Sequence, residues 1–155
     1  MSESWELDEL EPEVRGRSTE HWVLFLFALA IPIVLTLMAI GFTPDERGFG
    51  THEQLGIRPC LTLDLWGIPC PGCGVTTSVT LATQGRPLDS LRTQPFGLLL
   101  AIGGVLFTLW SLWATLRGRD LYVTIMNLPL ARLGRSLITV VLIAWIYKWI
   151  ATAAG

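Results

Sequence analysis

Charged residues are scarce in this chain. They make up 15% of its 155 residues, with 11 lysines and arginines against 13 aspartates and glutamates, whereas about a quarter of a typical soluble domain is charged. A water-facing surface needs more charge than this, so the composition argues against a soluble fold. The net charge of -2 and the lack of any Lys/Arg-rich stretch also exclude the basic surface that nucleic-acid binding requires. We therefore expect no nucleic-acid partner.

The chain also lacks the complete sequence pattern of a zinc ribbon and that of a thioredoxin-like protein. It has three cysteines and two histidines, and only one Cys-x-x-Cys pair, so no second pair completes the spacing of a zinc ribbon. No strand–helix–strand pattern surrounds the pair, as it would in a thioredoxin-like protein. Any role for these residues must therefore be argued from their immediate surroundings.

Long uncharged runs are what the sequence does contain. Trp22 to Pro44 and Thr93 to Leu116 are uncharged over 23 and 24 residues, and about 20 helical residues cross a bilayer core. A third run, Ser136 to Gly155, contains Lys148 near its end, where a lysine can extend to the interface among the neighbouring aromatic residues. The sequence predicts an all-α protein of the lipid bilayer, with three transmembrane helices at about 22–43, 95–116 and 136–154.

The predicted organisation is one membrane domain, residues 22–155, after an acidic N-terminal tail, residues 1–21. We interpret the tail as a solvated terminus, with a partner-docking role as the alternative. The loop 45–92 is too long for a plain connector and is where we expect function to lie. Its stretch from Gly74 to Gln84 predicts a short helix, opened by Thr76 or Thr77, that lies on the interface or re-enters the membrane.

Arginine content predicts the orientation. Residues 117–135 carry four arginines in 19 positions, whereas the loop 45–92 spreads four over 48. The positive-inside rule then places the N-terminus in the cytoplasm and the cysteine loop outside. In the second span, Gly97 and Ala101 form a small-residue face that favours close approach of a helix, either from a membrane-protein partner or from a second copy of the chain.

The candidate site is the set His52, Cys60, Cys70 and Cys73. Zinc in structural sites takes four Cys or His ligands, and these four residues supply a three-cysteine, one-histidine set. Alternatively, Cys70 and Cys73 are a redox pair with Cys60 as a further thiol, and Cys73 has the lower pKa because it precedes the short helix. A structural disulfide between Cys60 and one of the other two is the third interpretation.

The segments GTHEQLGIRPC, GIPCPGCGVTTS and LDSLRTQPFG resemble a family of small bacterial multi-pass membrane proteins. That family is a domain of unknown function with a Cys-Pro-x-Cys-Gly-x-Thr motif, which residues 70–76 match, and an upstream cysteine, which Cys60 matches. The resemblance covers roughly residues 50–116. One departure is Thr77, which stands where many members have an arginine. The resemblance implies a bacterial inner membrane location and implies no activity.

We therefore expect a non-enzymatic accessory or scaffold protein whose loop is organised by zinc or by a disulfide. The alternative is a membrane thiol-disulfide oxidoreductase that uses Cys70 and Cys73 with Cys60. Ion transport through the short helix is disfavoured, because no charged residue lies in the middle of a predicted span, where ion and proton pathways place them.

Overall fold

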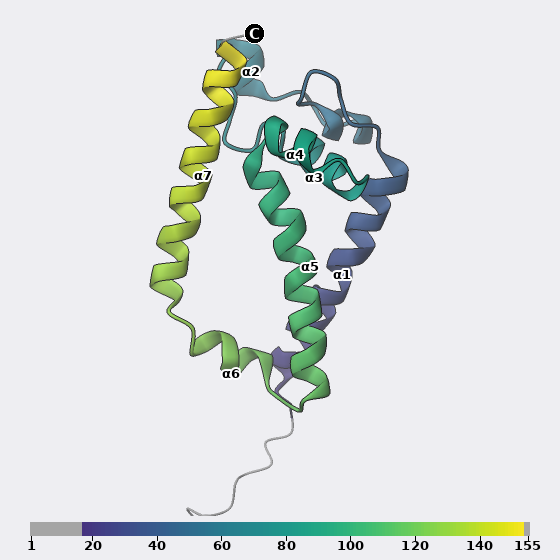
Figure 1. The fold of residues 1–155 in the computed structure, drawn as a ribbon, viewed down its shortest axis with the longest axis vertical. Helices are drawn as coiled ribbons and strands as arrows, with labels where there is room; N and C mark the ends of the chain where they lie inside the picture. The colour runs from purple at the N-terminus through teal and green to yellow at the C-terminus, as the bar shows by residue number, and fades with distance from the viewer. Residues whose placement is uncertain (1–16, 154–155) are drawn as a thin grey trace, which may run out of the picture.

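The computed structural model describes residues 17–153 of the chain, so most of the predicted acidic tail lies outside the described residues. Within them the fold is entirely helical, as predicted, and contains no strand. Its elements, in chain order, are α1 (Thr19–Gly41), the 3-10 helix η1 (Thr51–Leu55), α2 (Leu61–Trp66), α3 (Val75–Thr83), α4 (Pro87–Thr93), α5 (Pro95–Leu116), α6 (Leu121–Met126) and α7 (Leu130–Ala153) (Figure 1).

Three helices, α1, α5 and α7, are long and apolar enough to cross a membrane, which confirms the predicted number of spans. Helix α5 covers the same residues as the predicted second span. Helix α7 begins at Leu130, before the predicted start at Ser136. The carbonyl of Pro129 accepts from the N–H of Leu133, so Pro129 lies directly before the first residue of this helix, at a position where its missing N–H breaks no helical hydrogen bond.

Helices α1 and α5 pack closely, and Gly104 on α5 leaves room for Ile31 on α1. Ala28 and Ala101 are both buried, and a Cβ atom added at Gly104 would lie 2.9 Å from the side chain of Ile31. The Thr108 hydroxyl donates a 2.9 Å hydrogen bond to the Ala28 carbonyl across this contact. The small-residue face of α5 therefore serves packing within the chain.

Helix α3 matches the predicted short helix in position, but its start differs from the prediction. The N-cap is Gly74, in a left-handed conformation with φ 84°, and no side chain caps the helix. Thr77 and Ser78 point inward instead and are buried with the rest of the helix's middle. A Cβ atom at Gly97 would lie 2.6 Å from that of Ser78, so α3 rests directly on the first turn of α5.

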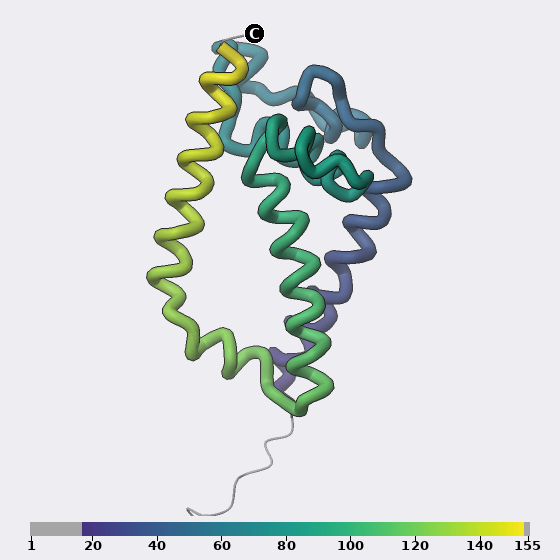
Figure 2. The backbone as a smooth tube through the Cα atoms, viewed as in Figure 1, coloured from purple at the N-terminus to yellow at the C-terminus, as the bar shows by residue number. Residues whose placement is uncertain are grey.

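The loop elements gather at one end of the long helices. There η1 and α2 to α4 lie together with the C-terminal end of α7, while α6 lies at the opposite end with the start of α1 (Figures 1 and 2). At that opposite end, the Leu121 N–H donates to Nδ1 of the buried His21, which ties α6 to α1. Helix α7 stands apart from α5 along most of its length and meets the chain at the loop end (Figure 1).

Candidate functional site

The three cysteines come together at the loop end. Cys60 is the N-cap of α2, and Cys70 and Cys73 form the turn before α3, closed by a 2.9 Å hydrogen bond from the Cys73 N–H to the Cys70 carbonyl. The Sγ atoms of Cys70 and Cys73 are 3.6 Å apart, and all three sulfur atoms lie within 4.8 Å of one another. The three cysteines are free thiols in this structure.

Gly74 fixes the end of the cysteine turn. Its φ of 84° is open to glycine and strained for residues with a side chain. A Cβ atom here would also lie 2.6 Å from the carbonyl oxygen of Gly48. The chain can therefore turn from Cys73 into α3 with the Gly48 backbone in close contact only because this position lacks a side chain.

Two distant side chains hold the cysteine turn by its proline carbonyls. The indole N–H of Trp145 on α7 donates to the carbonyl of Pro69 at 2.7 Å. The Gln94 amide at the start of α5 donates to the carbonyl of Pro71 at 3.3 Å. Trp145 is one of the aromatic residues near Lys148 that were expected at the membrane interface, and its contact with the cysteine turn has no signal in the sequence.

Lys148 also turns toward the loop. Its ammonium donates to the carbonyl of Gly48 at 3.0 Å and to that of Thr93 at 3.3 Å, and the side chain is buried. This differs from the predicted extension to the membrane interface. One turn of α7, residues 145–148, thus carries the contacts that join this helix to the cysteine loop, including a 2.8 Å hydrogen bond from Tyr147 to the Arg92 carbonyl.

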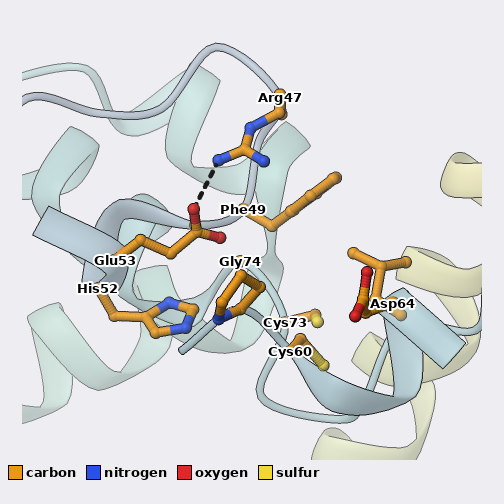
Figure 3. A pocket seen from close by; sticks show the side chains of 11 residues that line it. Arg47, Phe49, His52, Glu53, Cys60, Asp64, Cys73 and Gly74 are labelled. Carbon is orange, nitrogen blue, oxygen red and sulfur yellow. Dashed lines mark hydrogen bonds and ion pairs between the residues drawn. The ribbon is translucent and has the colours of Figure 1, made fainter. Parts of the chain in front are cut away.

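A pocket of about 300 Å³ opens beside the cysteines, between η1 and α2. Cys60 and Cys73 lie on one side of it and His52 on the other, with Asp64 also in its wall (Figure 3). The ligand atoms that lie within 4.8 Å of one another are the three cysteine sulfurs, and those of His52 and Asp64 are not among them. The structure thus places His52, Cys60 and Cys73 in the wall of one pocket, and it brings Cys70 into the sulfur cluster with Cys60 and Cys73.

Arg47 lines this pocket and forms two ion pairs. It pairs with Asp45 at 2.7 Å and with Glu53 at 3.1 Å, as Figure 3 shows for the second pair. The hydrogen bond from Arg47 lowers the pKa of Asp45 from its ordinary value. Because two carboxylates pair with Arg47, its guanidinium is not free to bind an anion in the pocket.

The thiols of the cluster have opposite pKa shifts. Burial raises the pKa of Cys60, but hydrogen bonds with Thr62 and Cys73 outweigh burial and lower the pKa to about 6. Burial and the hydrogen bond with Cys60 raise the pKa of Cys73 to about 12. The raised pKa of Cys73 differs from the lowered pKa predicted for this thiol, because Cys73 is buried and Gly74, not Cys73, is the residue that caps α3.

Next to the cysteine turn, two hydroxyl groups of α3, those of Thr77 and Ser78, form hydrogen bonds with other elements. The Thr77 and Thr51 hydroxyl oxygens are 2.8 Å apart and link α3 to η1. The Ser78 hydroxyl lies 2.8 Å from that of Ser90 and donates to the carbonyl of Gln94 at 2.7 Å. Thr76 or Thr77 was predicted to open the short helix, but Thr77 and Ser78 instead join α3 to its neighbours, whereas the hydroxyls of Thr80 and Thr83 bond back within α3.

Residues 60–108 match a family model described as a protein of unknown function (DUF2752). The match begins at Cys60 and extends through the cysteine turn, α3 and α4 into α5, so it covers the part of the chain that holds the cluster. This agrees with the resemblance to a domain of unknown function. No curated protein and no solved structure matches the chain.

Proposed function

We propose that the cysteine loop of this multi-pass membrane protein binds one zinc ion through Cys60, Cys70 and Cys73, and that the protein is a non-enzymatic accessory or scaffold protein. The observation that carries the proposal is the convergence of three free thiols, from two separate segments, within 4.8 Å. Thiolates are preferred zinc ligands, and a Cys-x-x-Cys turn is a common way to supply two of them.

The spacing of the thiols fits a tetrahedral site. With Zn–S bonds of about 2.3 Å, tetrahedral geometry puts ligand sulfurs roughly 3.8 Å apart. The Cys70 and Cys73 sulfurs are 3.6 Å apart, so this pair needs little movement to hold a metal. Cys60, within 4.8 Å of both, is close enough for a third bond after a small adjustment. A zinc ion there would draw the cysteine turn and the start of α2 together.

His52 is the fourth ligand that we propose. It lines the same pocket as Cys60 and Cys73. It lies on η1, whose N-cap Gly50 and C-cap Gly56 both have positive φ. A water molecule in the pocket is the alternative fourth ligand. The Asp64 carboxylate would accept a hydrogen bond from whichever of these is the fourth ligand, as carboxylates commonly do for metal-bound histidines.

Metal content tests the proposal. The full chain is purified in mild detergent without chelator, and metals are measured by mass spectrometry. We expect about one zinc per chain, loss of zinc in Cys70→Ser, and partial loss in His52→Ala. Asp89→Asn is the matched control, because it removes a carboxylate that pairs with Arg86 outside the pocket, and it is expected to retain zinc. A folded wild-type protein without metal would sink the proposal.

A thiol-disulfide oxidoreductase is the second candidate, and the low pKa of Cys60 beside a protonated Cys73 favours it. The Cys60 thiolate would attack a substrate disulfide, form a mixed disulfide and release one substrate thiolate. Cys70 would then attack Cys60, release the second substrate thiolate and leave a Cys60–Cys70 disulfide, so that two electrons pass to the substrate. In this case Cys70→Ser accumulates normally and traps mixed disulfides at Cys60, whereas loss of a structural zinc ligand lowers stability.

We further propose a bacterial inner membrane location with the N-terminus in the cytoplasm. The arginine distribution between the two loops supports this orientation, and it places the cysteine loop outside. Because the chain's three cysteines all lie in that loop, a membrane-impermeant maleimide reports its side directly. Labelling of intact cells after mild chelation supports the orientation, and labelling only after the membrane is opened contradicts it.

A further inference from the structure

Lys148 is the one lysine in the chain, and it lies on a membrane-spanning helix with 6% of its surface exposed. Its ammonium reaches the carbonyl oxygens of Gly48 and Thr93 and lies 5.8 Å from the centre of the Phe49 ring. These partners satisfy hydrogen bonds and provide a weak cation–π contact, but none of them carries a negative charge. The positive charge of Lys148 is therefore not compensated by these groups.

Within residues 17–153, no carboxylate forms an ion pair with Lys148 either. Among residues 17–153 the ion pairs are formed by Arg47 and Arg86, and none includes Lys148. A buried ammonium without an opposite charge is costly, and proteins normally pair such a group or coordinate it. The position of Lys148 thus calls for an anion at this end of the fold.

The anion that the fold can supply is the cysteine cluster. The Lys148 ammonium lies beside the turn that leads from Cys73 into α3, since a Cβ atom at Gly74 would be 3.2 Å from its nitrogen. Three thiolates around a divalent ion carry one net negative charge, whether a neutral histidine or water completes the site. One buried ammonium balances that charge.

We propose that Lys148 is the positioning residue that neutralises the anionic metal–thiolate centre of Cys60, Cys70 and Cys73. This inference rests on the proposed metal site. It assigns the third membrane helix a role in metal binding, because Lys148 delivers its charge from α7, outside the loop that holds the ligands. Groups around a metal site that do not touch the ion commonly change its affinity by about 10- to 100-fold.

Metal titration of the full chain in detergent tests the role of Lys148. The probe is cobalt(II), read by its thiolate-to-cobalt charge-transfer absorption, with zinc competition giving the zinc affinity. Lys148→Gln keeps a donor for the Gly48 and Thr93 carbonyls but removes the charge, and we expect it to weaken binding by about tenfold or more. Lys148→Arg keeps the charge and should restore most of the affinity. Tyr147→Phe is the matched control, because it removes a neutral hydrogen bond from the same turn of α7.

The outcomes are distinct. The charge-balancing role is supported if Lys148→Gln binds metal weakly, Lys148→Arg recovers the affinity and Tyr147→Phe is unchanged. An unchanged charge-transfer spectrum at saturation then shows that the ligands are the same. Equal affinity in Lys148→Gln and wild type overturns it, as does an equal loss in all three variants, which would mean that α7 acts by packing alone. If wild-type protein binds no cobalt or zinc, the proposed metal site itself has failed. Should Lys148→Gln not accumulate, Lys148→Met provides the same comparison.

Discussion

The indole N–H of Trp145 donates a 2.7 Å hydrogen bond to the carbonyl oxygen of Pro69, directly before the Cys-Pro-Gly-Cys turn. The two residues are 76 positions apart in the chain. Because α7 otherwise makes little contact with the other long helices (Figure 1), this bond and those of its neighbours on the same turn fix where the helix ends relative to the cysteines. The third span is therefore part of the structure that surrounds the site.

Trp145→Phe should loosen this end of α7. The variant keeps an aromatic ring but leaves the buried Pro69 carbonyl without its donor, at a cost of about 1 kcal/mol in the free energy of unfolding. We expect a lower thermal unfolding midpoint in detergent and faster maleimide labelling of the metal-free cysteines. Trp149→Phe is the control, since Trp149 is 52% exposed on the same helix. Equal behaviour of the two variants would contradict the role of the hydrogen bond.

Gly97→Ala should disrupt the contact between α3 and α5. The added Cβ atom would lie 2.6 Å from Ser78 and 2.9 Å from the carbonyl oxygen of Val75, and backbone atoms cannot move aside cheaply. Overpacking of this kind costs roughly 1–3 kcal/mol. Gly103→Ala, on the same helix with no atom within 4 Å of its Cβ position, should be neutral or stabilising by about 0.5–1 kcal/mol. Thermal unfolding in detergent distinguishes them, and similar midpoints for the two variants would show that the close approach does not limit stability.

Alkylation of the metal-free, reduced protein should be selective for Cys60. Its pKa of about 6 makes it a thiolate at neutral pH, whereas Cys73, with a pKa of about 12, stays protonated, and only the thiolate reacts rapidly. The rate at Cys60 should rise as pH increases through about 6 and change little above pH 8. Mass spectrometry of iodoacetamide-treated protein locates the label. A midpoint near pH 9, or preferential labelling of Cys73, would refute the assignment.

Local sequence features predicted the elements that depend on local physics. The uncharged run that starts at Pro95 predicted both ends of α5. Its length and hydropathy also predicted that the helix can cross a bilayer. Helix α3 was also predictable, since Gly85 and Pro87 stop it. The spacing of the cysteines identified the segment that carries the cluster and the motif it contains.

The rest depends on contacts between distant segments, which no local pattern encodes. Nothing in the sequence around Lys148 indicates that its ammonium meets the carbonyl of Gly48, 100 positions away, and a helix-end lysine ordinarily extends to the interface. The order of the thiol pKa values also needed the fold, because it depends on the burial of Cys73 and on the hydrogen bond between Cys60 and Thr62. In the same way, the predicted cap role of Thr77 gave way to its buried contact with η1.

Thr77→Val tests whether that contact stabilises the cysteine loop. The Thr77 and Thr51 hydroxyl oxygens are 2.8 Å apart and buried. Removal of one hydroxyl therefore leaves the other buried without this partner and lowers the free energy of unfolding by about 1–3 kcal/mol. Thr83→Val is the matched control, because the Thr83 hydroxyl bonds only within α3, to the carbonyl of Thr80. We expect a lower denaturation midpoint for Thr77→Val alone.

A double-mutant cycle with Thr51→Val isolates the interaction between the two hydroxyls. If they act as a pair, the double variant should be more stable than the sum of the single losses predicts, by about 0.5–1.5 kcal/mol. Thr51 also accepts from the Asp45 N–H at 3.1 Å, so Thr51→Val alone should cost more than Thr77→Val. Strictly additive losses would mean that the two hydroxyls stabilise α3 and η1 independently, and that the link between these elements rests on other contacts.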